Sequence, residues 1–227
     1  IRFRFSKTGA MALLSHLDLV RLLERALRRS GLPVSFTGGF HPLPRLQLAL
    51  ALPLGVEAEG EWMDLEFTEP VDPEDARESW QSRLPPGLSL LSAEDVPVSS
   101  ASLSQRLAFS RWRFNLSSGL DQHRCSSEDW EEAIAQLLRR DELIWEDTDK
   151  KGRPRRRDFR TLLTDLRLLS VDRVASTPSA QLELIAAVDV QGRSLKPAQL
   201  CSWLAELLGC ELTLSRVKRI ELGLLQC

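Results

Sequence analysis

The chain has 227 residues, of which 43% are hydrophobic and 27% charged, and its formal net charge at pH 7 is −2. This length is sufficient for one large domain or for two domains of about 100 residues, each with its own core. The longest apolar run, residues 46–54, is far shorter than the span of about 20 residues that a membrane-crossing helix needs. Composition therefore favours a globular protein of ordinary kind.

The first half of the sequence predicts the element order β-α-β-β-α-β. Residues 2–5 alternate Arg and Phe, which is typical of a strand, and Ser15, Asp18 and Gly31 are the start and stop signals of an amphipathic helix. The expected elements are a strand at 2–5, a helix at 15–30, strands at 46–52 and 61–68, a helix at 72–84 and a strand at 88–96.

The second half repeats this order after a Ser-rich stretch. Residues 111–114 show the same alternation as residues 2–5, which indicates an internal repeat. The expected elements are a strand at 111–114, a helix at 126–138, strands at 143–146, 166–171 and 181–190, a helix at 197–208 and a strand within 212–225. We therefore expect an α+β fold of two tandem ferredoxin-like units with antiparallel sheets, at 1–98 and 110–227, joined by a linker at 99–109.

A stiff loop interrupts the first unit between its helix and its next strand. Two glycines, an aromatic ring, two prolines and a base follow one another there, and such loops are disproportionately functional. The candidate binding residues in this loop are Gly38, Gly39, Phe40, His41, Pro42 and Arg45.

One arc of the preceding helix is cationic. Arg21, Arg25, Arg28 and Arg29 lie opposite its leucines on a helical wheel, so an RNA backbone lying along this arc would gain attraction and release counterions. The alternative is a solvated helix surface whose charge Asp18 and Glu24 relieve.

A second basic segment lies between residues 149 and 160, where seven bases stand against two acids, a local charge of +5. Its turn-forming sequence predicts a protruding β-hairpin inserted in the second unit. Seven like charges favour contact with a polyanion, and the alternative is a disordered loop that only aids solubility. The bases are Lys150, Lys151, Arg153, Arg155, Arg156, Arg157 and Arg160.

The spacing of the histidines and cysteines does not match a metal-binding motif. The three histidines are far apart, and the four cysteines lack any Cys-x-x-Cys pair, so we predict no metal site and a reducing, cytoplasmic setting. His16 and His41 are conceivable as an acid and base for RNA cleavage, but no third group that would orient them is evident. A packed or capping role for His16 and a bracing role for His41 are the alternatives.

Several motifs of the first unit resemble the radical-SAM-linked protein family. They are Ser15-His16-Leu17-Asp18 with Arg21, the arginine-rich stretch 24–29, Gly39-Phe40-His41-Pro42-x-Pro44-Arg45 and residues 51–55. Members of that family are fused to, or encoded beside, cobalamin-binding radical S-adenosylmethionine enzymes, so the resemblance implies an accessory role beside such an enzyme. The family often has Asn at the position of His41, which weakens a catalytic role for this residue.

Three functions follow as hypotheses. The first is a non-catalytic RNA-binding module that positions a structured RNA, a tRNA or rRNA, for a radical SAM enzyme. The second is a protein-docking domain for that enzyme, and the third is a metal-independent ribonuclease. No cofactor is expected in this chain, because it lacks the Cys-x-x-x-Cys-x-x-Cys run that holds a four-iron cluster. S-adenosylmethionine, the iron–sulfur cluster and cobalamin are expected only in the fused or separate partner.

Overall fold

The computed structural model describes residues 1–118, 125–149, 151–172 and 178–225, which form two compact units. The first comprises Ile1–Leu107 together with the segment from Arg219, and the second comprises Ala108–Lys218. The elements of the first unit are β1 (Arg2–Lys7), η1 (Gly9–Leu13), α1 (His16–Ser30), β2 (Leu46–Leu48), β3 (Glu57–Leu65), α2 (Pro73–Gln81), β4 (Leu88–Glu94) and α3 (Leu103–Arg106).

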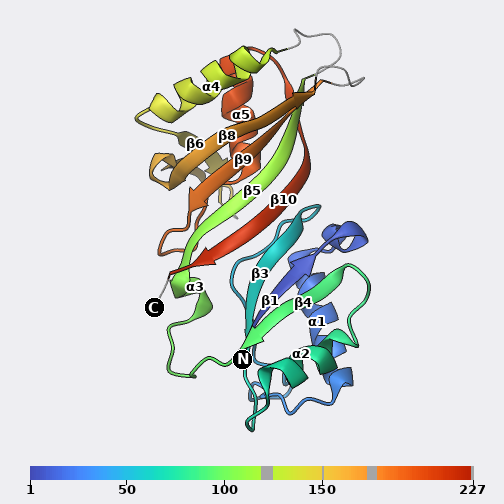
Figure 1. Ribbon diagram of the computed structural model, residues 1–227. Coiled ribbons are helices and arrows are strands. Elements are labelled where there is room, and N and C mark those ends of the chain that lie inside the picture. Colours follow the sequence, from blue (N-terminus) through green and yellow to red (C-terminus); the bar gives the residue numbers. More distant parts are fainter. Residues whose placement is uncertain (119–124, 150, 173–177, 226–227) are drawn as a thin grey trace. The chain divides into compact units, whose positions relative to one another are not determined.

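Antiparallel pairing builds the sheet of the first unit, in the order β4-β1-β3, with β2 also paired to β3. Alternation in β1 sends Phe3 and Phe5 to the face that α1 and α2 cover (Figure 1), and the T-shaped contact of Phe3 with Trp80 ties α2 to the sheet. The core there is apolar and closed, and both helices belong to it.

Predicted end signals set the limits of α1. Ser15 is the N-cap and accepts a hydrogen bond from the amide of Asp18, while Gly31, with φ of 75°, ends the helix in the left-handed conformation. The amphipathic pattern is also confirmed, since Leu19, Leu23 and Leu27 are buried on one side of α1.

The strand predicted at 46–52 is wrong in its extent. The leucine alternation continues, but pairing stops with β2 at Leu48, and β3 begins at Glu57, four residues before the predicted start at Glu61. The reason is tertiary: the carbonyls of Leu50 and Ala51 accept hydrogen bonds from the Arg219 guanidinium instead of from a strand.

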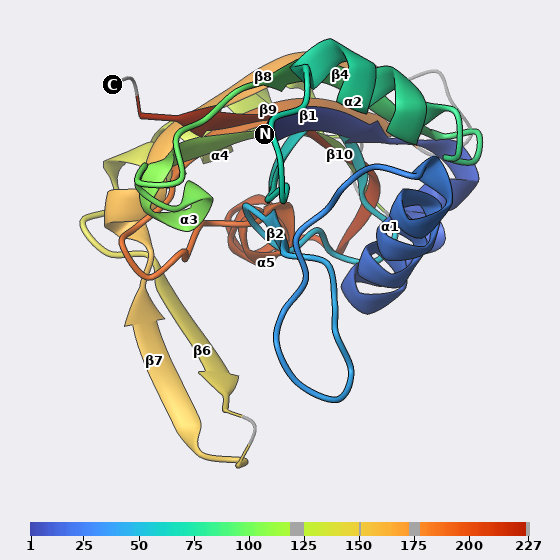
Figure 2. The same ribbon diagram turned by 90° about the horizontal axis from the view of Figure 1, so that it is seen from below.

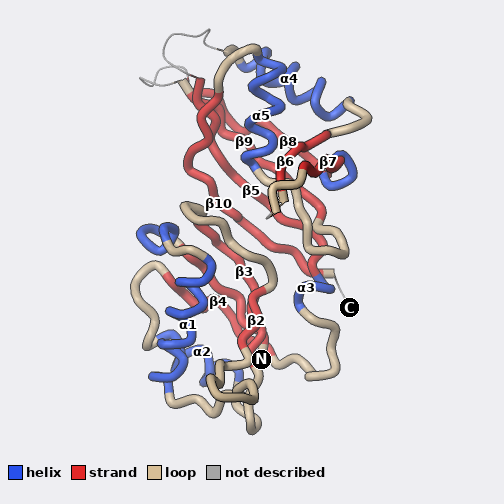
Figure 3. Tube along the Cα trace, turned by 180° about the vertical axis from the view of Figure 1, so that it is seen from behind, coloured by secondary structure: helices blue, strands red, loops and turns tan. Residues whose placement is uncertain are grey.

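The elements of the second unit are β5 (Leu107–Ser118), α4 (Ser127–Arg139), β6 (Ile144–Thr148), β7 (Pro154–Asp158), η2 (Arg160–Leu162), β8 (Leu163–Asp172), β9 (Ser179–Ala187), α5 (Pro197–Leu208) and β10 (Leu212–Leu224), whose last residues belong to the first unit. The strand order is β10-β5-β9-β8, and the pairs β5–β9 and β8–β9 are antiparallel. Trp130 of α4 and Leu204 of α5 are buried, as is Phe114 of β5, and Figure 3 shows the two helices beside these strands.

The predicted basic hairpin is confirmed: β6 and β7 pair antiparallel, with Trp145 opposite Arg157 and Asp147 opposite Arg155. They form a two-stranded sheet of their own, and Figure 2 shows them extending from the second unit. The α+β class with mainly antiparallel strands is thus as expected. The tandem ferredoxin-like assignment and the domain boundaries at 98 and 110 stay predictions.

Candidate functional site

The stiff loop after α1 is a hairpin. Phe36 and Pro44 form an isolated antiparallel bridge, the amide of Thr37 donates to the carbonyl of Leu43 at 2.8 Å, and the amide of Arg45 donates to that of Ser35 at 2.9 Å. These bonds close the base of the loop, which Figure 2 shows extending well away from α1. The prediction of a constrained loop therefore has a physical basis in backbone hydrogen bonds.

Its tip is open to solvent. Gly39 has φ of 111°, a conformation that side-chain-bearing residues rarely adopt, and Gly38, Phe40, His41 and Pro42 are exposed. The Phe40 ring is fully exposed. A large apolar ring at the end of a braced hairpin has no role in a core, so its available contacts are with a ligand or partner.

Arg28 joins the loop to the helix. Its Nη2 donates to the Pro42 carbonyl at 3.2 Å, and its guanidinium carbon lies 5.6 Å from the centroid of the Phe36 ring. Arg45, at the other end of the loop, pairs with Glu66 at 3.4 Å. The structure therefore brings one predicted arginine of α1 together with the predicted loop.

The four predicted arginines of α1 are all exposed, but they differ in their partners. Arg21 pairs with Asp18 at 3.5 Å. This ion pair fits the alternative of a solvated helix surface on which acids offset the arginine charge. Arg25 donates to the carbonyl of Arg21 and Arg29 to that of Arg83. Within the described part of the chain, no carboxylate lies within 4 Å of Arg25, Arg28 or Arg29, so these three retain their positive charge without an ion-pair partner.

A further arginine, which the sequence did not single out, joins this group. A pocket of about 380 Å³ is lined by Arg25 and Arg29 of α1 and by Arg83, just beyond α2, with an apolar side formed by Leu22 and Leu84. Arg83 is a single base after a helix, so no local charge pattern marks it. Arg83 comes to line the same pocket as Arg25 and Arg29 only because α1 and α2 pack together.

The cations of the β6–β7 hairpin are mostly paired with acids of the same hairpin. Arg155 and Arg157 both contact Asp147, and Arg153 pairs with Asp149 at 2.8 Å. Arg156 lies 3.7 Å from Glu146 and 3.9 Å from Glu142. The local charge that the sequence window suggests is therefore largely balanced by acids on the facing strand, although the Arg153 and Arg156 side chains remain 71% and 66% exposed.

The two ends of this predicted basic segment differ from its middle. Arg160 donates to the carbonyls of Leu138, Arg140 and Leu163, so its guanidinium closes the end of α4. Lys151 is exposed in the turn, and Lys150 lies outside the described residues. Arg160 thus has a structural use that the sequence did not reveal.

His16 and His41 lie in different surroundings. His16 is the first residue of α1 and half-buried, and its buried Nδ1 finds no hydrogen-bond partner among the described residues, while His41 is exposed at the loop tip. No hydrogen bond joins these two side chains in the described ranges. A concerted acid and base role for His16 and His41 therefore stays a hypothesis without a supporting contact in this part of the chain.

Two arginines of the β-strands, Arg2 in β1 and Arg113 in β5, form ion pairs with acidic side chains. Arg2 is buried and makes a bidentate contact with Asp64, at 2.8 and 2.9 Å. Arg113 pairs with Glu183 on the neighbouring strand β9 at 3.0 Å. In both cases an acid on the neighbouring strand balances the charge of the arginine.

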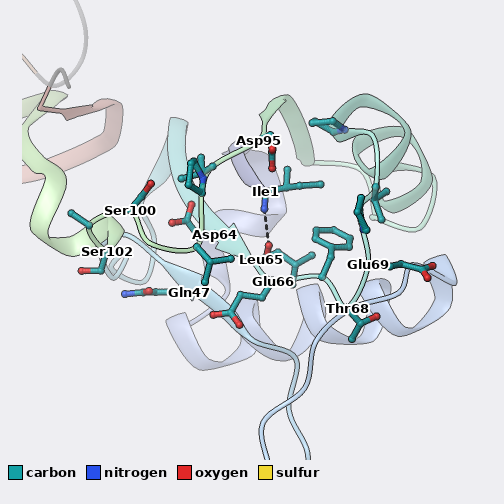
Figure 4. Close-up of a pocket in the computed structure, with 18 residues that line it drawn as sticks. Ile1, Gln47, Asp64, Leu65, Glu66, Thr68, Glu69, Asp95, Ser100 and Ser102 are labelled. Atoms are coloured by element: carbon teal, nitrogen blue, oxygen red, sulfur yellow. Dashed lines mark hydrogen bonds between the residues drawn. The ribbon is translucent and has the colours of Figure 1, made fainter.

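A second pocket of the first unit, of about 620 Å³, has the opposite charge. Asp64, Glu66, Glu69 and Asp95 line it, and Figure 4 shows their side chains around Ile1, whose ammonium donates to the Leu65 carbonyl at 2.8 Å. An acidic wall repels phosphate, so this pocket is unsuited to a nucleic-acid backbone.

Three charged side chains are buried together in the first unit. The Arg219 guanidinium makes two bonds to the Glu61 carboxylate, at 2.5 and 2.6 Å, and Lys7 Nζ donates to the carbonyls of Ala12 and Leu14. Burial lowers the pKa of Lys7, with Glu61 acting against that shift and Arg219 adding to it. Arg219 is 1% exposed, so this cluster belongs to the interior.

Comparison with protein families settles where the chain belongs. The model of the family described as "Uncharacterized protein conserved in bacteria (DUF2344)" matches residues 1–197. The chain belongs to this family. The matched range includes the loop, the α1 arginines and the β6–β7 hairpin, and it ends before Arg219. Among curated proteins, no match is found.

Solved structures give the DUF2344 chain a fold-level likeness. A chain of "Crystal Structure of a Cbf5-Nop10-Gar1 Complex" is similar with a TM-score of 0.51 at 12% identity; the match covers 96% of this chain and 48% of that one, so the present chain spans about half its length. "Crystal Structure of an Unknown Protein from Galdieria sulphuraria" matches at 14% identity and TM-score 0.27, over 94% and 95% of the two chains. At 12% identity, the likeness to the chain of the Cbf5-Nop10-Gar1 complex concerns the fold alone.

Across the described ranges, no group of three His, Cys, Asp or Glu side chains is placed to hold a metal ion. The same ranges contain no helix with the length and apolar character needed to cross a membrane. The predicted site residues are divided between the two units, with the loop and α1 in the first and the β6–β7 hairpin in the second.

Proposed function

We propose that this protein is a non-catalytic RNA-binding module that positions a structured RNA, such as a tRNA or rRNA, for a radical SAM modifying enzyme. The observation that carries the proposal is the group Arg25, Arg28 and Arg29, which are exposed, have no carboxylate partner within the described residues and lie beside the braced loop through the Arg28–Pro42 hydrogen bond.

Charge repulsion makes such a group costly unless a polyanion is bound. Adjacent guanidinium groups on one helix face repel one another, and a phosphate backbone relieves that repulsion while releasing its own counterions. Arg28 ties Pro42 of the loop to the helix, and Phe40 stands exposed two residues before Pro42. Contacts to phosphates would position the RNA, and Phe40 would stack on an unpaired base.

The β6–β7 hairpin is a second, weaker contact in this proposal. Its arginines form ion pairs with Asp147, Glu146 and Asp149, so each phosphate contact competes with an existing ion pair. Arg153 and Arg156 are exposed enough to exchange partners. We therefore assign the larger share of affinity to α1.

The enzyme partner enters the proposal from the resemblance of the motifs around Ser15, Gly39 and residues 51–55 to radical-SAM-linked proteins. This chain holds no Cys-x-x-x-Cys-x-x-Cys run, so the cluster, S-adenosylmethionine and cobalamin would all belong to the partner. The module would supply substrate positioning only.

Affinity for bulk tRNA measured between 50 and 300 mM salt tests the proposal. Binding should weaken linearly on a double logarithmic plot, and the double variant R25A/R29A should lower the slope by about 1 for each lost phosphate contact. The control is R139A, which removes an exposed arginine from the last turn of α4 in the second unit. Absence of binding at low salt, or a slope unaffected by R25A/R29A, would reject RNA binding at this face.

A protein-docking role is the second candidate, and the exposed rings favour it. Phe36, Phe40 and Leu43 are exposed along one loop, which is a suitable anchor for an apolar groove. Co-purification with the radical SAM enzyme that survives 1 M salt and is lost in F40A would support docking. Cleavage of RNA that H41A abolishes would instead identify a ribonuclease, and intact RNA after long incubation would dismiss it.

A further inference from the structure

The pocket between the end of α1 and the residues after α2 is strongly cationic. Three arginines, Arg25, Arg29 and Arg83, line it, and its lining contains no acidic residue. Its volume of about 380 Å³ greatly exceeds that of one phosphate group, so a phosphate can enter together with part of the molecule that carries it.

Two of these arginines are held in place by backbone contacts. Arg25 Nε donates to the Arg21 carbonyl at 3.2 Å, and Arg29 Nη2 donates to the Arg83 carbonyl at 3.1 Å. Each guanidinium has five N–H donors, so one bond orients the group and leaves others for a ligand. The bond from Arg29 also fixes the position of Arg83 relative to α1.

The surrounding helix ends do not account for all three charges. Arg29 lies in the last turn of α1, where a base complements the helix dipole. Arg25 lies a turn earlier, and Arg83 follows the C-cap residue Ser82 of α2. Among the described residues none of these three arginines has an ion-pair partner, and several arginines around one pocket suit a tetrahedral dianion, because a guanidinium can bind two phosphate oxygens at once.

We infer that Arg25, Arg29 and Arg83 form a binding site for one phosphate group, as part of an RNA backbone or of a small phosphorylated molecule. The inference deepens the proposed function and rests on it for the RNA source, but phosphate binding itself is independent of RNA. Leu22 and Leu84 give the site an apolar side that a nucleoside or other organic moiety can contact.

Inorganic phosphate is the probe for the first arm of the test. Titration of the ¹⁵N-labelled full chain should shift the side-chain Nε–Hε signals of Arg25, Arg29 and Arg83, assigned by single Arg→Lys variants, while the signal of Arg139 stays unchanged. R83A should weaken phosphate binding by about tenfold or more, since a charge-assisted hydrogen bond is lost. The phosphate affinity of R83K, which retains the charge but not the planar guanidinium, should lie between that of R83A and that of the wild type.

A second arm separates the two sources of phosphate. If R83A also weakens tRNA binding and reduces its salt slope, the site holds an RNA phosphate. If phosphate binding is lost in R83A but tRNA binding is not, the site holds a small phosphorylated molecule. RNA binding then depends on the other proposed contact residues and not on Arg83. Signals that remain unshifted at 50 mM phosphate would overturn the inference, and tRNA binding in the same samples would show that the proposed function survives without it.

R83A is informative only if it is folded. Arg83 is exposed and surface substitutions usually change stability little, so the urea unfolding midpoints of R83A and R139A should match that of the wild type within experimental error. A variant that met this criterion and still bound phosphate as the wild type does would also overturn the inference.

Discussion

Arg219 and Glu61 are separated by 158 positions in the sequence, yet they form a buried, doubly hydrogen-bonded ion pair within the first unit. The Arg219 and Glu61 side chains are 1% and 3% exposed, and the guanidinium also donates hydrogen bonds to the carbonyls of Leu50 and Ala51. A late segment of the chain therefore completes a core that begins with the first strand.

Replacement of Glu61 should show how much this core depends on the pair. Glu61→Gln removes the carboxylate charge that pairs with the buried Arg219, so we expect a loss of about 3–5 kcal/mol in the free energy of unfolding, measured by urea denaturation. Glu66→Gln, which breaks the exposed pair with Arg45, should cost less than about 1 kcal/mol. Equal losses in the two variants would contradict the importance assigned to burial.

Lys7 should make stability rise with pH in the alkaline range. Its pKa is lowered by burial from the ordinary value of 10.5, so between the lowered pKa and 10.5 the unfolded chain binds more protons than the folded protein. Stability from this group therefore increases with pH through that window and is lost as pH falls through the folded pKa. The difference in unfolding free energy between wild type and Lys7→Met, followed from pH 7 to 10.5, should show this slope. A constant difference would mean that the Lys7 pKa is not lowered.

The Cys210 thiol should react slowly with alkylating agents. Burial, and then the neighbouring Cys125, raise its pKa from 9.0 to about 11, so little thiolate is present at pH 8. Modification by iodoacetamide, followed by mass spectrometry of the Cys210 peptide, should accelerate as pH approaches 11. Cys125→Ala should lower the pKa and speed modification at pH 9, though burial remains. Rapid modification of the wild type at pH 8 would contradict this assignment.

The brace between Arg28 and the loop is testable by hydrogen exchange. Arg28→Ala removes the bond to Pro42 and the contact with the Phe36 ring, so the amides of Thr37 and Leu43, which are bonded across the loop base, should exchange faster. Phe40→Ala is the matched control, because its ring is fully exposed and should leave those amides unchanged. Exchange that is the same in Arg28→Ala and wild type would show that the backbone bonds alone hold the loop.

Features with local causes were predictable from the sequence. Ser15 and Gly31 delimit α1 through interactions within a few residues, and the turn near Gly152 produces the β6–β7 hairpin because its glycine adopts φ of 76°. The alternation of Phe3 and Phe5 likewise places both in the core. Each of these signals is read within one element.

Features with distant causes were not predictable. β2 ends early because Arg219 takes the carbonyls that follow it, and no pattern near Leu48 reveals this. The basic segment was overestimated as a free cationic arm, since its partners Asp147 and Glu146 lie on the facing strand. Arg83 was missed for the same reason: its significance depends on which helix packs beside it.

The position of Arg219 has a consequence for synthesis. A ribosome completes the strands and helices of the first unit long before it adds this residue, and until then Glu61 has no guanidinium to balance it. The interior charge of the first unit therefore stays unmatched while the 158 positions after Glu61 are added, and a segment made that much later completes the core around β1.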